Sequence, residues 1–193
     1  RGRAMLAAAL LALVALVFAL PAFSLLLLTL AAGRRPAPFT VGTLSATLPR
    51  VAVLVPAHNE SRNVLPTIAC LQPQMRAGDR LLVVADNCSD DTAALARAAG
   101  ALVIERHDAS LRGKGYALAF GVDHLRADPP DVVMVVDADC VVSEGAVARI
   151  ATESAQTGCP VQMLNLMHAS PGAGVRLRIL EFAMVVKNLV RPL

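Results

Sequence analysis

Between residues 50 and 150 the sequence alternates between short apolar runs and segments with helical periodicity. Runs rich in Val and Leu occupy 51–55, 81–85, 101–105 and 132–136. The segments between them carry apolar residues spaced as on one face of a helix. Strand–helix repeats with short links form parallel sheets with right-handed crossovers and helices on both faces. We therefore predict an α/β fold with a doubly wound, mostly parallel sheet, in which the first and fourth strands lie side by side.

Polar residues follow the apolar runs wherever a strand is expected to end. His58-Asn59-Glu60 follow the first strand, which we expect to end at Pro56, and Asp86-Asn87 follow the second; the loop 107–114 follows the third. Asp137 and Asp139 follow the fourth. The carboxyl ends of parallel strands meet at one edge, where such sheets bind ligands. Turn capping alone does not predict this gathering.

Asp137 and Asp139 form an acid–x–acid pair within VVMVVDADCVV. Ionised carboxylates are costly to bury without a partner, so the pair either caps a turn or holds something positive. Two hard oxygen donors suit Mg²⁺ or Mn²⁺, which share their coordination shell with water and substrate phosphates. Strand alternation predicts that both acids point the same way, with Ala138 opposite and Cys140 packing rather than binding.

Two further candidates come from the loops. Arg112-Gly113-Lys114-Gly115 is not a Walker sequence, but glycines around a lysine at a helix start let backbone amides and a cation approach an anion. An ordinary exposed turn is the alternative. Asp86 is expected at a strand end rather than inside the core, so that it would serve binding more than folding.

Charge and cysteine usage limit the classes of partner. Four of the 18 basic residues lie before residue 36, where there is no acid, so the rest of the chain is nearly neutral with its 15 acids. A near-neutral body without Trp argues against a nucleic-acid partner. The four cysteines are too far apart for C-x-x-C pairs and are expected to be free thiols in a reducing compartment.

Residues 4–33 carry no charge, and a helix needs only about 20 residues to cross a membrane. We predict an N-terminal transmembrane helix that Pro21 either kinks or divides from an interfacial turn, followed by a linker at 33–38. Arginines flank both ends, so charge does not set the orientation. A tail helix over 174–191 suits either a core position or the membrane surface.

Four segments in this order, VAVLVPAHNE, VVADNCSDDTA, RGKGYAL and VVMVVDADC, resemble the membrane-anchored family 2 glycosyltransferases over residues 50–145. The resemblance implies the A-type glycosyltransferase fold, with a Rossmann-like sheet that binds a nucleotide-sugar donor. By resemblance, Asp86 recognises the base and Asp139 binds the metal, with Asp137 beside it near the ribose and diphosphate. The remaining implied donor contacts are Pro56, Ala57, His58, Glu60 and Lys114.

The implied organisation is an anchor and linker at 1–36, a donor-binding domain at 50–158 and the start of an acceptor-side region at 159–193. The family's Glu-Asp acceptor acid and Gln-x-x-Arg-Trp motif have no match, so we expect the general base beyond Leu193.

The expected reaction is inverting, metal-dependent transfer from a nucleotide diphosphate sugar, with UDP-sugar as the expected donor. The acceptor would be membrane-associated, lipid-linked or a polysaccharide under synthesis. We expect the inner membrane and the cytoplasmic side, because glycans on the sequons at Asn59 and Asn87 would block the pocket. The alternatives are a nucleotidyltransferase, which needs a glycine-rich basic loop after the first strand, and a non-catalytic nucleotide-binding membrane protein.

Overall fold

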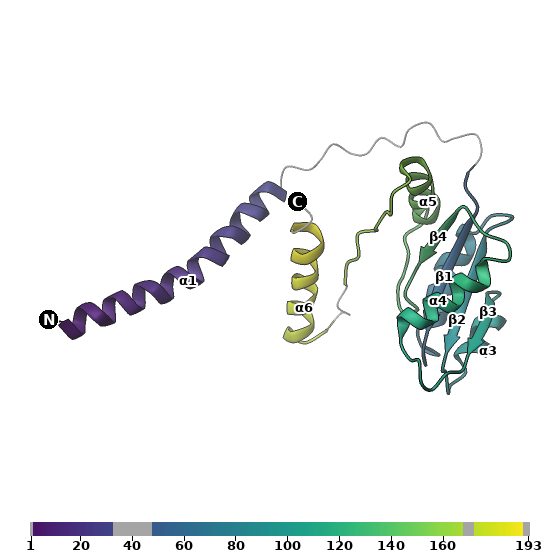
Figure 1. The fold of residues 1–193 in the computed structure, drawn as a ribbon, viewed down its shortest axis with the longest axis horizontal. Helices are drawn as coiled ribbons and strands as arrows, with labels where there is room; N and C mark the ends of the chain where they lie inside the picture. Colours follow the sequence, from purple (N-terminus) through teal and green to yellow (C-terminus); the bar gives the residue numbers. More distant parts are fainter. Residues whose placement is uncertain (1, 33–47, 168–171, 191–193) are drawn as a thin grey trace. The chain divides into compact units, whose positions relative to one another are not determined.

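The computed structural model describes residues 2–32, 48–167 and 172–190 (Figure 1). Residues 41–162 form one compact unit, and residues 1–40 with 163–193 form a second. The expected linker at 33–38 lies outside the described residues. The four cysteines are free thiols.

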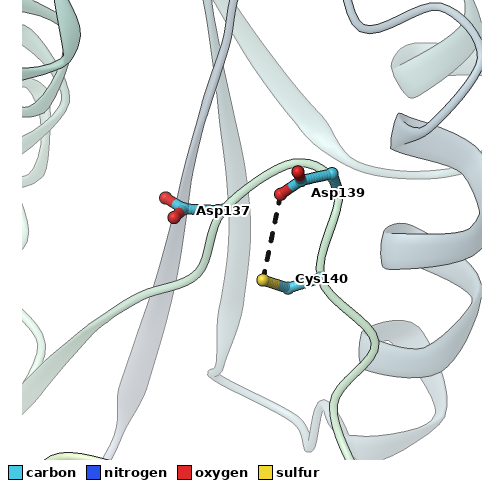
Figure 2. A group of neighbouring side chains, drawn as sticks. All are labelled: Asp137, Asp139 and Cys140. Carbon is cyan, nitrogen blue, oxygen red and sulfur yellow. Dashed lines mark hydrogen bonds between the residues drawn. The ribbon is translucent and has the colours of Figure 1, made fainter. Parts of the chain in front are cut away.

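The compact unit is built on a parallel sheet, which confirms the predicted fold class and the pairing of the first and fourth strands. Its order is β3-β2-β1-β4. The strands are β1 (Val51–Ala57), β2 (Arg80–Asp86), β3 (Leu102–Arg106) and β4 (Val132–Val135). The helices are α2 (Val64–Leu71), the 3-10 turn η1 (Gln72–Gln74), α3 (Thr92–Ala98), α4 (Lys114–Leu125) and α5 (Ala146–Thr157). The chain leaves β4 into the turn that carries Asp137 and Asp139 (Figure 2).

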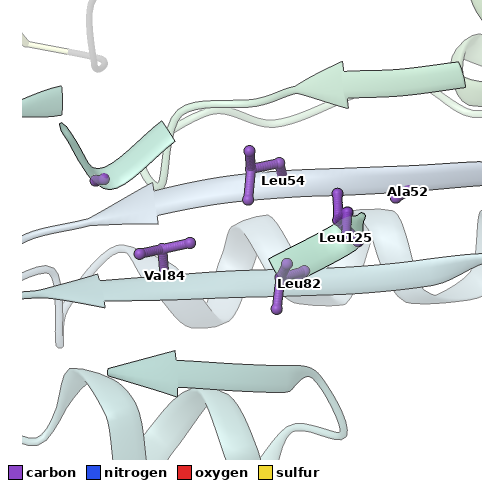
Figure 3. Close-up of a cluster of buried hydrophobic side chains, with 6 residues drawn as sticks. Ala52, Leu54, Leu82, Val84 and Leu125 are labelled. Atoms are coloured by element: carbon purple, nitrogen blue, oxygen red, sulfur yellow. The ribbon is translucent and has the colours of Figure 1, made fainter. Parts of the chain in front are cut away.

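The central strand β1 is buried on both faces, as its unbroken apolar sequence predicts. Residues 51–55 are at most 1% exposed. Alternate residues of β1 and β2 pack against α4 on one face (Figure 3). This cluster consists of Ala52, Leu54, Leu82, Val84, Ala117 and Leu125.

The expectation that β1 ends at Pro56 is wrong, because the strand continues to Ala57. The Leu54 carbonyl accepts a hydrogen bond from Val136 N at 3.1 Å, so the polar groups of Leu54 face β4. Residues two apart in a strand face the same side, and the β1–β4 ladder ends at the pair Leu54 and Val135. The missing N–H of Pro56 therefore removes no ladder hydrogen bond. Beyond this point β1 pairs with β2 alone.

The second unit contains two helical segments. Helix α1 (Gly2–Ala32) runs through Pro21, so the predicted interfacial turn before a separate crossing helix is wrong. Among the described residues, its segment Ala8–Leu28 is the one stretch long and apolar enough to span a membrane, judged by length and composition. The predicted tail helix is observed as α6 (Val175–Val185) followed by a π-helical turn, η2 (Val186–Val190).

Helix α4 lies close against the sheet at Gly121. A Cβ atom at this position would lie 2.4 Å from Leu54 Cδ1 and 2.9 Å from Val84 Cγ2. Only glycine fits here without movement of the Leu54 and Val84 side chains, because real Cβ contacts do not reach such distances.

We predict that Gly121→Ala lowers the free energy of unfolding by about 1–3 kcal/mol, the usual cost of overpacking a core. Chemical denaturation of the full chain in detergent measures it. Gly115→Ala on the same helix is the control, since no atom lies within 4 Å of its added Cβ. Equal stability of the two variants would contradict the tight α4–sheet contact.

Candidate functional site

The carboxyl ends of β1 and β2, the turn after β4 and the start of α4 surround a cavity of about 460 Å³. All eight residues predicted as donor or metal contacts line it: Pro56, Ala57, His58, Glu60, Asp86, Lys114, Asp137 and Asp139. Five further residues line it as well: Asn87, Arg112, Gly113, Ala117 and Ala138. The gathering follows from the parallel sheet, while the roles of the single residues remain predictions.

The two acids after β4 lie in a turn, because β4 ends at Val135 (Figure 2). Strand alternation therefore does not orient them, and that part of the prediction is wrong. The turn closes with a hydrogen bond from Cys140 N to Asp137 O at 3.1 Å. Ligand atoms of Asp137, Asp139 and Cys140 all lie within 4.8 Å of one another.

Of these three groups, the two carboxylates suit a hard divalent cation. The Cys140 Sγ lies 3.9 Å from Asp139 Oδ1. Burial, and then the charges of Asp139 and Asp137, raise the pKa of the Cys140 thiol, which stays protonated. Mg²⁺ and Mn²⁺ prefer oxygen ligands, and two carboxylates suffice when water and phosphate oxygens complete the shell. The donor set present therefore fits such an ion.

Positive groups line the same cavity as these acids. Lys114 Nζ donates a hydrogen bond to Asp137 Oδ1, and both side chains are about half exposed. Exposed pairs of this kind contribute about 1 kcal/mol or less, so Lys114 can exchange Asp137 for another anion. Lys114 begins α4, whose N-terminus attracts negative charge, and Arg112 lines the same cavity. The sequence analysis named Arg112 in the same loop but predicted a donor contact only for Lys114.

Asp86 is held at the floor of the site by an ion pair that the sequence reading missed. Its side chain is 7% exposed, and Oδ1 accepts hydrogen bonds from Arg106 Nη1 at 2.7 Å and Asn87 Nδ2 at 3.0 Å. The expectation that Asp86 lies outside the core is therefore wrong. Asp86 and Arg106 are register partners at the ends of β2 and β3. Opposite charges closing two neighbouring strands were the available signal.

Arg106 has two further contacts that fix its position. Its Nη2 lies 3.2 Å from Asp108 Oδ2, and its guanidinium carbon lies 5.6 Å from the centre of the Tyr116 ring. The Arg106 side chain is only 10% exposed. Asp86 therefore binds to a preorganised cation rather than to a mobile one.

Two asparagines turn the chain sharply where β1 and β2 end. Asn59 has φ +56° and Asn87 has φ +52°, a left-handed conformation that asparagine adopts more readily than most residues. Asn59 Oδ1 accepts from Ser89 N at 2.8 Å. Asn87 Oδ1 accepts from Asp108 N at 2.8 Å. Each side chain thus fastens its own turn to a neighbouring loop.

A second set of hydrogen bonds joins the same loops beside Glu60. Glu60 N donates to the buried Thr92 Oγ1 at 2.8 Å, and Ser61 N donates to Asp90 Oδ2 at 3.1 Å. The Thr92 hydroxyl in turn donates to Asp90 Oδ1 at 2.5 Å. These bonds, the Thr92 hydroxyl first, lower the pKa of Asp90 to about 2. Asp90 therefore stays ionised, and the loops stay joined, at neutral pH.

His58 and Glu60 are both held by local hydrogen bonds. The Asp86 carbonyl can only accept, so His58 Nδ1 carries the proton in their 2.7 Å contact. Glu60 Oε2 accepts from Asn63 Nδ2 at 2.8 Å. These contacts aim both side chains from the β1 end toward the cavity that they line.

Comparison with protein families identifies the chain. The family described as glycosyl transferase family 2 matches residues 52–182, which is more than half of the sequence. The chain belongs to this family, as its four sequence segments predicted. A search of curated proteins finds none that matches.

One solved structure has the same fold, and two others are similar over a smaller part of the chain. Mannosyltransferase PcManGT from Pyrobaculum calidifontis, in complex with GDP-Man and Mn²⁺, is 24% identical, with 75% of this chain and 43% of that chain covered and a TM-score of 0.58. Glucosyl-3-phosphoglycerate synthase from Mycobacterium tuberculosis in complex with UDP is 32% identical. The match covers 56% of this chain and 40% of that chain, with a TM-score of 0.44. The same synthase in complex with Mn²⁺, UDP and glucosyl-3-phosphoglycerate is 32% identical, and the match covers 54% of this chain and 39% of that chain, with a TM-score of 0.43.

Two of these structures are complexes that hold Mn²⁺ together with a nucleotide or nucleotide sugar. The chain spans about two fifths of the length of these solved proteins.

We predict that Asp86→Ala lowers the free energy of unfolding by about 3 kcal/mol, because it leaves Arg106 buried with only Asp108 as a partner. Denaturation curves measure the loss. Asp128→Ala is the matched control: its exposed pairs with Arg50 and Arg80 predict a loss of about 1 kcal/mol or less. The double variant Asp86→Ala/Arg106→Met should recover part of the stability. A loss no larger than that of Asp128→Ala would show that the pair is not structural.

Proposed function

We propose that this chain carries the donor-binding part of an inverting, metal-dependent glycosyltransferase that uses a UDP-sugar. The observation that carries the proposal is the presence of an acid pair and a cationic helix start in the lining of one cavity. Asp137 and Asp139 line it together with Arg112 and Lys114, and Lys114 Nζ donates a hydrogen bond to Asp137. A metal-bound diphosphate needs both signs of charge within a few ångströms.

The hydrogen bonds of Asp86 favour uracil over guanine as the base. Both of its protein hydrogen bonds use Oδ1, so Oδ2 is the oxygen that is left to accept a hydrogen bond from a base. Uracil presents a single ring N–H donor that one carboxylate oxygen satisfies. Guanine presents a ring N–H beside an amino group, and such a pair of donors is matched best by two oxygens.

The chain's own residues would act mainly on the leaving diphosphate. Asp137 and Asp139 would hold the divalent ion, which supplies positive charge to the departing phosphate oxygens. Lys114 would exchange Asp137 for the diphosphate, and the N-terminus of α4 would add its backbone N–H groups. Pro56 and Ala57 would form the apolar wall beside the nucleoside, with His58 and Glu60 at its end.

We propose that the general base comes from outside the donor cavity. The acids that line the cavity are Glu60, Asp86, Asp137 and Asp139, and each has a hydrogen-bond partner or a donor-side role. A base must reach the acceptor hydroxyl instead. With about two fifths of the length of its structural relatives, the chain would bind donor while sequence beyond Leu193 supplies the base.

The loop after β1 separates this proposal from a nucleotidyltransferase. That activity needs a glycine-rich basic loop at this place, and the chain has His58-Asn59-Glu60 directly after Ala57. Family membership points the same way.

We predict that Asp139→Asn weakens UDP binding in the presence of Mn²⁺ by about 1–3 kcal/mol, the usual loss for a charged ligand group. UDP binding without metal should change little. Calorimetry on the full chain in detergent, with and without Mn²⁺, measures both. Asp123→Asn removes the same charge from an exposed position on α4 that does not line the cavity, and it should bind as the wild type does. Equal affinity of the Asp139 and Asp123 variants would overturn the metal role.

We propose that α1 anchors the chain in the cell inner membrane, with the donor site on the cytoplasmic side and a membrane-associated, lipid-linked or polysaccharide acceptor. The free thiols support the cytoplasmic side, as do the two sequons, one of which has its Asn87 in the lining of the cavity.

We predict that a membrane-impermeant maleimide labels Cys159 only after the membrane is permeabilised. Cys159 is the exposed thiol, whereas burial raises the pKa of the Cys88 thiol and slows its labelling. A variant with Cys159 as the sole cysteine makes the readout specific. Labelling of intact cells would place the site outside.

A further inference from the structure

We propose that Thr67 is a positioning residue that holds Asp137 and Asp139 in their metal-binding arrangement from behind. Thr67 lies on α2 and does not line the cavity. It is 1% exposed, and its Oγ1 donates a hydrogen bond of 2.8 Å to the carbonyl of Ala138. Ala138 is the residue between the two acids and is 4% exposed. The inference rests on the proposed function, because it assigns a role toward the metal ligands.

A second contact from the same helix fastens the far end of the turn. Val142 N donates to Cys70 Sγ at 3.2 Å. Thr67 and Cys70 are three residues apart, so they lie on the same face of α2. The helix therefore holds the turn in the middle and at its exit.

The acids themselves have little else to fix them. Asp137 contacts the half-exposed Lys114, and among the described residues Asp139 accepts only the weak Cys140 thiol contact of 3.9 Å. Their separation is consequently set by the turn backbone, which the buried Thr67 hydroxyl holds in place. Groups behind metal ligands orient them in this way, and their loss typically costs 10–100-fold in affinity.

The hydroxyl can be removed with almost no change of shape. Thr67→Val replaces the hydroxyl by a methyl group, which leaves the buried Ala138 carbonyl without its donor. The carbonyl then turns toward water, and both acids move with it. Thr67→Ser keeps the donor and removes only the methyl group.

The test measures Mn²⁺ affinity of the full chain in detergent at saturating UDP, by electron paramagnetic resonance of free Mn²⁺. We expect Thr67→Val to bind Mn²⁺ about tenfold more weakly, at the low end of that range, and Thr67→Ser to bind within about twofold of wild type. UDP affinity without metal should not change. Hydrogen exchange of the Cys140 and Val142 amides in metal-free Thr67→Val should be faster than in wild type.

The control is Thr152→Val. Thr152 is also buried, at 3% exposed, and its hydroxyl donates to Ala148 O at 2.7 Å within α5, away from the acids. It should lose stability without losing Mn²⁺ affinity. Equal Mn²⁺ affinity of wild type and Thr67→Val, or equal losses in the two valine variants, would overturn this inference alone. A wild-type chain that binds UDP but no Mn²⁺ would overturn the metal role in the proposed function, and this inference with it.

Discussion

Burial of β1 between two parallel neighbours is the constraint on which the rest of the structure depends. A strand that is apolar on both faces needs neighbours at both edges and covering helices, because its backbone groups cannot reach water. Parallel pairing then forces each connection to cross back over the sheet. All strands consequently end at the same edge, and the polar residues after them meet there. The cavity is a result of strand direction before it is a result of any single side chain.

Two aspartates in the cavity, Asp86 and Asp137, differ in burial and therefore in how firmly their ion pairs hold them. Asp86 is buried against Arg106, and breaking such a pair is costly, so its carboxylate is a fixed feature of the floor. Asp137 is half exposed against Lys114, and such a pair exchanges readily with other ions. A ligand in the cavity would therefore meet a fixed carboxylate at Asp86 and an exchangeable ion pair at Asp137 and Lys114.

The sequence predicted those features that depend on residues close together in the chain. A run of apolar residues predicted each strand, and the polar residues at its end follow that run directly in the sequence. The Asp86–Arg106 pair and the Thr67–Ala138 hydrogen bond were missed because each depends on how distant segments pair or pack. The end of β1 was wrongly predicted at Pro56 for the same reason, because the effect of the missing N–H depends on where the β1–β4 ladder ends. The turn after β4 was predicted as strand because Val136 extends the apolar run and residues 137–139 alternate polar and apolar as strand residues do.

The register of the sheet also orders its assembly. Ala52 pairs with Arg80 in β2, whereas Val51 pairs with Val132 in β4, almost three times as far along the chain. Closing the longer loop costs about 1 kcal/mol more in chain entropy, and long-range pairings form late in folding. The β1–β2–β3 part, with Asp86 and Arg106, can be complete before β4 docks. Asp137 and Asp139 would then reach the cavity last, so the chain completes the Asp86 part of the cavity before the acid pair is in place.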